Sequence, residues 1–405
     1  PKITTNISLT TDNSPTIEGT AEPGTTINLL INGINAGVTS ISDEITGAFS
    51  LTTSNVLSDG DYQLSVTATD LAGNTSSESS RLSLTIDTTL PIPPTITSSQ
   101  SSTQNTQPVI DGIAEAGTTI TLFINGSSDG ITVVANESSG AFQLTAPELG
   151  EGNYEFTVTA RDAAGNTSSP SSVYALTVDT TAPVTPTITT TTSLTKDSTP
   201  TIVGTAEAGS TVTLFVNGTS TGVTTTADGT TGAFSITAPE QTDGTYGLTV
   251  TATDTAGNIS TASDAVSFTI DTTAPGKPTI STEAATINDT TPTISGTAEA
   301  GSTVTLFVDG STTGVTATAD GSSGAFTITP SSALTAGSSY DLTVTATDTA
   351  GNTSPASDAV SFTIDTTAPL KPSISTSGAT TNDTTPEISG TAEAGSTVTL
   401  FVDGS

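Results

Sequence analysis

The sequence has no cysteine, histidine, tryptophan or methionine among its 405 residues. Without cysteine there are no disulfides, no thiolate nucleophiles and no cysteine metal sites. Without histidine the chain lacks both the usual general base and the usual zinc ligand. Serine and threonine are abundant, but a hydroxyl nucleophile needs an adjacent base to activate it. We therefore expect that the chain is not an enzyme.

Positive charge is also scarce, because Lys and Arg together number 6 against 40 acidic residues, which gives a net charge of -34. Binding to phosphate groups needs Lys and Arg, so we expect no nucleic-acid partner. No apolar run is long enough to cross a membrane, so we expect no membrane span. No signal-like stretch is present either, and we expect the sequence to be an internal fragment of a longer protein.

One stretch, STVTLFVDG at 302–310, recurs along the chain and sets its organisation. Close copies occur at 210–218 and 396–404, and looser copies at 118–126 and 25–33. A Glu that follows Ala marks each copy, and this marker returns about every 93 residues. A period of this length indicates tandem domains rather than short solenoid units. The predicted domains are 1–90, 91–182, 183–274 and 275–368, followed by a partial repeat at 369–405.

Each repeat consists of short segments in which apolar and polar residues alternate, and no segment shows helical periodicity. In the fourth repeat we expect strands at 277–280, 293–297, 302–310, 315–319, 324–329, 340–347 and 359–364. Tyr340 opens the sixth of these shortly after Gly337, and Tyr62, Tyr154 and Tyr246 occupy equivalent positions, as in a tyrosine corner. The pattern predicts an all-β chain of tandem immunoglobulin-like Greek-key β-sandwiches of about seven strands. Each sandwich should add roughly 40 Å of length, from strands of about seven residues plus loops.

Acidic residues recur at the ends of these strands. Because neighbouring strands alternate in direction, Glu299, Asp320 and Asp348 should share one pole, where Asp271 arrives from the preceding repeat. Carboxylates that converge repel one another unless a cation joins them, and oxygen ligands alone select Ca²⁺. The predicted calcium ligands at the joints are Asp87, Glu115, Asp162, Asp179, Glu207, Asp228, Asp254, Asp271, Glu299, Asp320, Asp348, Asp365 and Glu393. The alternative is that these acids are present because Asp and Asn form turns.

Several motifs of the fourth repeat carry a family resemblance: GTAEAGSTVTLFVDG, GAF, YDLTVTATDTAGN and IDTTAP. They resemble the bacterial immunoglobulin-like repeats of giant surface adhesins and biofilm-associated proteins, and the resemblance extends over the whole sequence. It implies an extender stalk on the bacterial cell surface, exported by type I secretion, whose partners are its neighbouring repeats. A host or surface receptor would then be bound elsewhere in the protein.

In that family several repeats bind Ca²⁺ at domain junctions, which stiffens the stalk. The resemblance gives those roles to Asp87, Asp179, Asp271 and Asp365 and to Glu115, Glu207, Glu299 and Glu393. Asn136 departs from the acidic pattern at the joint between the first two repeats.

A second hypothesis is a repeated module that binds carbohydrate or another ligand weakly in each domain and gains strength by avidity. Sugar-binding surfaces usually present aromatic side chains, and this sequence has few. Phe123, Phe215, Phe307 and Phe401 point away from the expected core face and could form such a patch.

Overall fold

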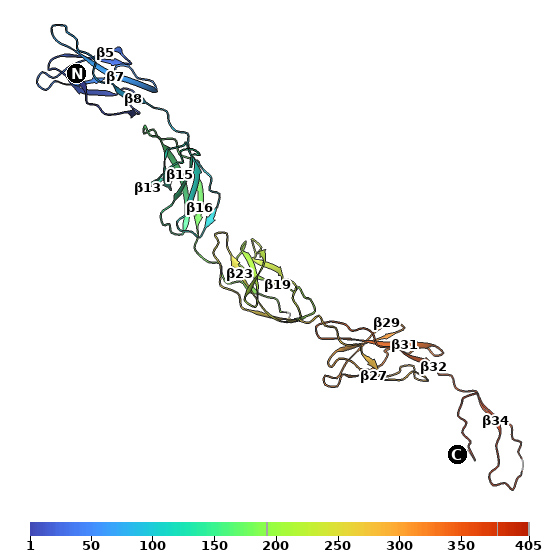
Figure 1. Cartoon of the computed structure of the whole chain (residues 1–405). Helices are drawn as coiled ribbons and strands as arrows, with labels where there is room; N and C mark the ends of the chain where they lie inside the picture. The colour runs from blue at the N-terminus through green and yellow to red at the C-terminus, as the bar shows by residue number, and fades with distance from the viewer. Residues whose placement is uncertain (192, 379, 404–405) are drawn as a thin grey trace. The chain divides into compact units, whose positions relative to one another are not determined.

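The computed structural model describes residues 1–191, 193–378 and 380–403, and every regular element in these ranges is a β-strand. The chain divides into two compact units, 1–184 with 252–261, and 185–251 with 262–405. Figure 1 shows the labelled strands gathered into successive repeats. Within the described ranges there is no helix with the length and apolar character that a membrane crossing requires.

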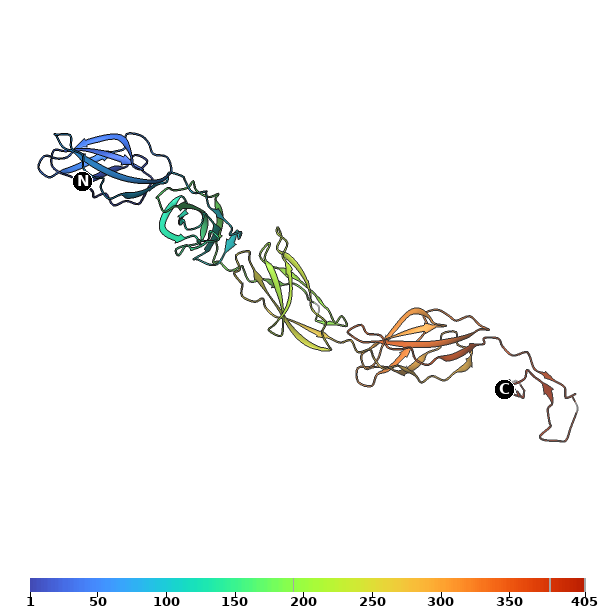
Figure 2. The ribbon, with the colours of Figure 1, turned by 45° about the horizontal axis from the view of Figure 1, so that its top comes forward.

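Each complete repeat is a sandwich of a three-stranded and a five-stranded sheet, seen from a second direction in Figure 2. In the fourth repeat the small sheet has the order β25-β27-β30 and the large sheet the order β26-β32-β31-β28-β29. Their bounds are β25 (Thr279–Ile280), β26 (Ala285–Ile287), β27 (Ile294–Thr297), β28 (Thr303–Val308), β29 (Ser311–Thr318), β30 (Ala325–Ile328), β31 (Ser339–Thr347) and β32 (Val360–Ile364).

The other repeats have the same strand order. The first comprises β1 (Lys2–Ile3), β2 (Leu9–Thr10), β3 (Thr16–Thr20), β4 (Thr26–Ile31), β5 (Ile34–Ile41), β6 (Ala48–Thr52), β7 (Gly60–Thr69) and β8 (Leu82–Ile86). The second comprises β9 (Thr95–Ile96), β10 (Ser102–Thr103), β11 (Val109–Ile113), β12 (Thr119–Ile124), β13 (Ser127–Val134), β14 (Ala141–Thr145), β15 (Gly152–Arg161) and β16 (Tyr174–Val178). The third comprises β17 (Thr187–Ile188), β18 (Leu194–Thr195), β19 (Thr201–Thr205), β20 (Thr211–Val216), β21 (Thr219–Thr226), β22 (Ala233–Thr237), β23 (Gly244–Thr253) and β24 (Val266–Ile270). The partial repeat contains β33 (Ser373–Ile374) and β34 (Gly390–Thr391).

The all-β sandwich fold is therefore confirmed, with eight strands in a complete repeat where the sequence predicted about seven. The additional strand is β26 and its equivalents β2, β10 and β18, each of which pairs in parallel with the last strand of its own repeat. A strand of two or three residues is too short to show an alternating pattern. Its partner lies most of a repeat away in sequence, so no local signal marks it.

The core of each sandwich follows the predicted alternation of apolar residues. Val304 and Leu306 of β28 are fully buried, as are Leu342 and Val344 of β31. Every complete repeat has its own cluster of buried apolar side chains. Since burial of apolar surface is the main force that favours folding, each repeat has a basis for stability of its own.

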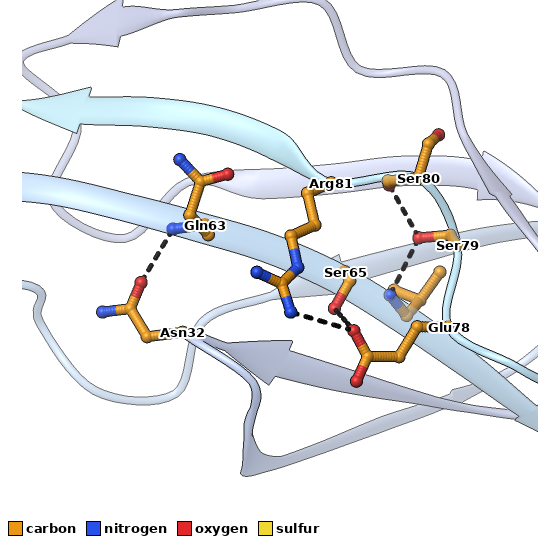
Figure 3. A network of polar contacts seen from close by, with 8 residues as sticks. Asn32, Gln63, Ser65, Glu78, Ser79, Ser80 and Arg81 are labelled. Carbon is orange, nitrogen blue, oxygen red and sulfur yellow. Dashed lines mark hydrogen bonds and ion pairs between the residues drawn. The ribbon is translucent and has the colours of Figure 1, made fainter.

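Two local devices fix the sandwich. The first is the hairpin turn after β4, where Asn32 and Gly33 have φ of 51° and 78°, typical of a type I′ turn. The Asn32 Oδ1 atom also accepts a hydrogen bond of 2.8 Å from the Gln63 backbone N–H of β7 (Figure 3). Asn125, Asn217 and Asp309 occupy the same turn position and accept the equivalent bond from the neighbouring strand.

Figure 3 also shows Glu78 of the first repeat, which accepts a hydrogen bond from Ser65 and pairs with Arg81 at 3.7 Å.

The second device is the predicted tyrosine corner. The hydroxyl of Tyr246 donates to the Thr242 carbonyl at 2.9 Å, and Tyr62 and Tyr154 make the same bond to the residue four places before them. In the fourth repeat the Tyr340 hydroxyl instead accepts a bond of 3.0 Å from the Thr335 N–H. The corner therefore forms in every complete repeat, with this variation in the last.

Candidate functional site: the joints between repeats

The acids that the sequence assigned to calcium lie at the ends of the sandwiches, but they do not assemble into a cluster. In the described part of the chain, no group of three or more Asp or Glu side chains is placed to hold a metal ion. The joining of Asp271 to Glu299, Asp320 and Asp348 by Ca²⁺ therefore stays a prediction. Most of these carboxylates accept hydrogen bonds close to their own position in the chain.

The linker-end acids bond within the linker itself. The Asp271 Oδ1 atom accepts from the Thr273 N–H at 3.1 Å, and Asp87, Asp179 and Asp365 make the equivalent bond. In the turn before β30, Asp320 accepts from the N–H groups of Ser322 and Ser323 and from the Ser323 hydroxyl. The backbone bond from Ser323 contributes most to holding the pKa of Asp320 below its usual value, and Thr231 does the same for Asp228. These four linker-end acids, Asp228 and Asp320 thus act as turn-forming residues.

The Glu residues of the turn after β3 and its equivalents differ among the repeats. Glu115 and Glu393 each reach back to the start of their own repeat, where the Oε2 atoms accept from the N–H groups of Ile92 at 3.4 Å and Leu370 at 3.0 Å. Glu207 and Glu299 are exposed. Their backbone carbonyls accept the hydroxyls of Ser210 and Ser302 at 2.7 Å.

A different set of acids, which the sequence analysis missed, holds the linkers. The Asp243 carboxylate accepts from the Thr272 N–H at 2.8 Å and from the hydroxyls of Thr272 and Thr273 at 2.7 Å. The hydroxyl of Thr273 contributes most to lowering the pKa of Asp243. Asp59 and Glu151 hold Thr88–Thr89 and Thr180–Thr181 in the same way, and their pKa values are also lowered. We call this arrangement of one acid and two threonines the linker clamp.

A sequence signal for the linker clamp does exist. Each clamp acid directly precedes the Gly that begins the tyrosine-corner strand, and the paired threonines follow the last strand of the same repeat. In the fourth repeat Ala336 precedes the corresponding Gly337, so no carboxylate is available at that position to hold Thr366 and Thr367.

The Asp of the loop after the long tyrosine-corner strand has a third role. The Asp348 Oδ1 atom accepts the Asn352 N–H at 2.8 Å, and Oδ2 accepts the Asn352 side-chain amide at 2.8 Å. The same Asn352 amide also donates to the main-chain carbonyl of Asp271 in the preceding repeat, at 2.7 Å. Asn166 donates to the Asp87 carbonyl at 2.9 Å and Asn258 to the Asp179 carbonyl at 2.8 Å. Both atoms of each pair belong to a single compact unit, because loop 252–261 groups with residues 1–184.

A second donor reaches this loop from the turn before the third strand of the preceding repeat. The Lys196 Nζ atom donates to the Gly351 carbonyl at 2.8 Å, and Gln104 donates through Nε2 to the Gly257 carbonyl at 3.1 Å. At Gly165 the Nε of Arg161, from the same repeat, bonds the equivalent carbonyl at 3.3 Å.

A family model described as "Bacterial Ig-like domain" matches residues 4–88, 95–180, 187–272 and 278–366. The chain belongs to this family.

Among curated proteins, the bacterial Ig-like repeats are similar to parts of two larger enzymes. Exoglucanase B of Cellulomonas fimi is 33% identical over 318 residues, which cover 64% of the chain and 27% of that protein. Chitinase A1 of Niallia circulans is 34% identical over 195 residues, which cover 42% of the chain and 27% of that protein. The chain thus spans about a quarter of the length of these relatives.

Among solved structures, a structure from a 1.5-MDa bacterial ice-binding adhesin is 24% identical with a TM-score of 0.25, and the alignment covers 64% of the chain and 91% of that structure. A structure of the BSP domain of a biofilm-associated protein is 14% identical with a TM-score of 0.19, over 91% of the chain and 96% of that structure.

The outward-facing aromatics of the Ig-like repeats are partly covered. Phe123, Phe215 and Phe307 are half-buried on the outer face of the larger sheet, whereas Phe401 of the partial repeat is 68% exposed. A polar cleft of about 430 Å³ lies in the second repeat beside Tyr174, whose hydroxyl donates to the Gln100 carbonyl at 2.8 Å. The positions equivalent to Tyr174 carry Leu82, Val266 and Val360, so the other repeats do not present this aromatic. Repeated ligand binding stays a prediction.

Proposed function

We propose that the chain is a spacer segment of a large bacterial cell-surface protein, of the stalk type used by adhesins. The observation that carries the proposal is the combination of self-sufficient cores with anchored joints. Each complete repeat has its own buried cluster, and the three joints between complete repeats hold the linker on one side and the next repeat's loop on the other. A spacer needs both properties. Independent folding allows the chain to be lengthened by adding repeats, and anchored joints keep the chain extended.

The composition supports the same role. A net charge of -34 keeps a long protein soluble and discourages association between copies. The absence of histidine and cysteine leaves no conventional nucleophile and base pair, so we propose a structural role without catalysis.

A finer proposal concerns calcium. Ca²⁺ would join Asp271 of one repeat to Glu299 and Asp348 of the next, with Asp320 as a further ligand. As placed, these carboxylates do not fit the ion, because Asp271, Asp320 and Asp348 accept hydrogen bonds in their own turns. Binding would require them to exchange these bonds for the ion, and the expected affinity is that of extracellular modules, roughly 10⁻⁴–10⁻³ M.

Distance measurements across one joint test the spacer and the calcium together. Because the chain has no native cysteine, two introduced cysteines, one in each of the third and fourth repeats, would carry spin labels at unique positions. We expect a narrow distribution of label distances in buffer with chelator. A broad distribution, both with chelator and with about 10 mM Ca²⁺, roughly ten times the weak end of that affinity range, would contradict the spacer role.

The calcium proposal has its own outcome in the same experiment. A narrower distribution on addition of Ca²⁺, lost in Asp271→Asn with Glu299→Gln, would support the ion. An identical distribution in chelator and in Ca²⁺ would contradict it.

The carbohydrate-binding alternative would be favoured instead if the whole chain bound sugars on a glycan array and Tyr174→Ala or Phe307→Ala reduced that binding.

A further inference from the structure

We propose that consecutive repeats are coupled by a metal-independent latch, in which an Asn side chain of one repeat binds the main-chain carbonyl of the residue that directly follows the last strand of the repeat before it. The latch comprises Asn166 on Asp87, Asn258 on Asp179 and Asn352 on Asp271. The proposal deepens the spacer function, on which it rests for its purpose, by naming the residues that couple the repeats. It also differs from calcium binding, because neither the donor nor the acceptor atom of the latch is ionised.

The donor is held in place before it meets its partner. In the fourth repeat Asp348 forms a closed loop with Asn352, since its N–H donates to the Asn352 carbonyl at 3.0 Å and its two carboxylate oxygens accept the Asn352 backbone and side-chain N–H groups. Burial raises the pKa of Asp348, but the combined hydrogen bonds from Asn352, Gly351 and Ala350 outweigh this and leave the pKa below its usual value. The carboxylate therefore stays charged at neutral pH and keeps the amide oriented, so little conformational freedom is lost when the latch closes.

The acceptor is fixed as well. The N–H of Asp271, the residue whose carbonyl is bound, donates to the Thr195 carbonyl of β18 at 3.0 Å. Asp87 and Asp179 make the same bond to Thr10 of β2 and Thr103 of β10. The short additional strand of each repeat thus holds the residue that presents the carbonyl. The latch consequently joins two ordered parts, a strand end and a closed loop, rather than two mobile segments.

The first repeat provides an internal comparison. Its loop makes the same closed arrangement, since the Asn74 backbone and side-chain N–H groups bond Asp70 at 2.8 Å, yet within residues 1–191, 193–378 and 380–403 no strand end of another repeat lies against it. Asn74 is exposed, whereas Asn166, Asn258 and Asn352 are 8%, 6% and 8% exposed. Ser76 is likewise exposed where its equivalents Ser168, Ser260 and Ser354 are 6% exposed. The loop therefore forms without a partner, and contact with the preceding repeat accounts for the burial.

The test uses the whole chain with Asn352→Ala, Asn166→Ala and, as the matched control, Asn74→Ala. All three substitutions remove the same side-chain bond within the loop, but only the first two remove a bond to another repeat. We expect Asn352→Ala to broaden the distances between labels on the third and fourth repeats, in the presence of chelator. It should also speed amide exchange at 272–274 by roughly two- to tenfold, the effect of one hydrogen bond on an equilibrium.

Asn166→Ala should have the same effects at 88–90 and between the first two repeats, and Asn74→Ala should leave every joint unchanged. The latch is refuted if Asn352→Ala and Asn166→Ala show wild-type distances and exchange in chelator. It is also refuted if Asn74→Ala loosens the joints as much as they do, because the effect would then come from damage to the loop. Failure of the spacer role is recognised separately, since the wild-type joints would already be broad.

Discussion

At the scale of single residues, the carboxylate and amide side chains of this chain mainly form hydrogen bonds with groups a few residues away in the sequence. Sequence reasoning located Asp271, Asp320 and Asp348 at the ends of the sandwiches, which is where they lie. It assigned them to an ion because a sequence does not reveal whether the donors around an oxygen come from its own turn. It missed Asp243 because the partners of this residue lie about thirty residues away in the linker.

The linker clamp gives a prediction on pH. The pKa of Asp243 is lowered in the folded chain, chiefly by the hydroxyl of Thr273, from an ordinary value of 3.8. Its contribution to stability is therefore complete above the pKa of the unfolded chain and is lost as the pH falls through the lower, folded value. We expect the NMR shifts of Thr272 and Thr273 to stay constant above about pH 5 and to change below pH 3.8.

Two comparisons control this experiment. Asp243→Asn should abolish the acid transition at Thr272, whose N–H and hydroxyl both bond Asp243, and Thr366, which follows the repeat with Ala336, should lack it in the wild-type chain. A transition centred at or above the ordinary value of 3.8 would contradict the clamp.

At the scale of strands and sheets, alternation of apolar residues was enough to predict most strands and the direction of their buried faces. The short strands β2, β10, β18 and β26 escaped because they depend on parallel pairing with a distant strand. The role of the glycine in the third strand of each repeat could not be predicted from the sequence either. At Gly204 a Cβ atom would overlap the Thr187 carbonyl oxygen and lie 2.6 Å from Cζ of Phe234, so the aromatic ring covers the bare backbone.

We predict that Gly204→Ala destabilises the third repeat by about 2 kcal/mol, because overpacking against a backbone oxygen and a core ring cannot be relieved by one flexible side chain. The measurement is chemical denaturation of the whole chain, monitored by amide signals of residues in that repeat. Gly229→Ala is the control, since a Cβ there meets nothing within 4 Å. Equal midpoints for the two variants would show that the close approach at Gly204 is not a constraint.

At the scale of the whole chain, the period of about 93 residues predicted the repeats, and each complete repeat proved to have its own core. The latches at the joints were harder to predict, because they join a side chain to a main-chain oxygen. Main-chain acceptors occur at every residue, so the sequence of a joint gives the donor Asn352 and leaves its partner undetermined until the strand end is placed.

We predict that residues 275–368, excised as one repeat, fold alone with or without Ca²⁺, since the buried cluster of that repeat is complete within these bounds. Asn352 should then become exposed as Asn74 is, and its amide should exchange faster than in the whole chain. Dispersed NMR signals in both conditions would agree with this prediction. A collapsed spectrum in chelator that disperses only with Ca²⁺ would instead make the ion part of the fold.

The use of a main-chain carbonyl as the acceptor at each joint also affects how such a chain can evolve. The stretches at 210–218, 302–310 and 396–404 are nearly identical, so a whole repeat can be added or removed with little change in the sequence on either side of it. After such an event a repeat meets a new neighbour. Its Asn can still bind a main-chain carbonyl at the strand end, because every residue has a main-chain carbonyl whatever its side chain. Joints of this kind tolerate reshuffling, and length can vary between lineages without a matching change on the opposite side of each new contact.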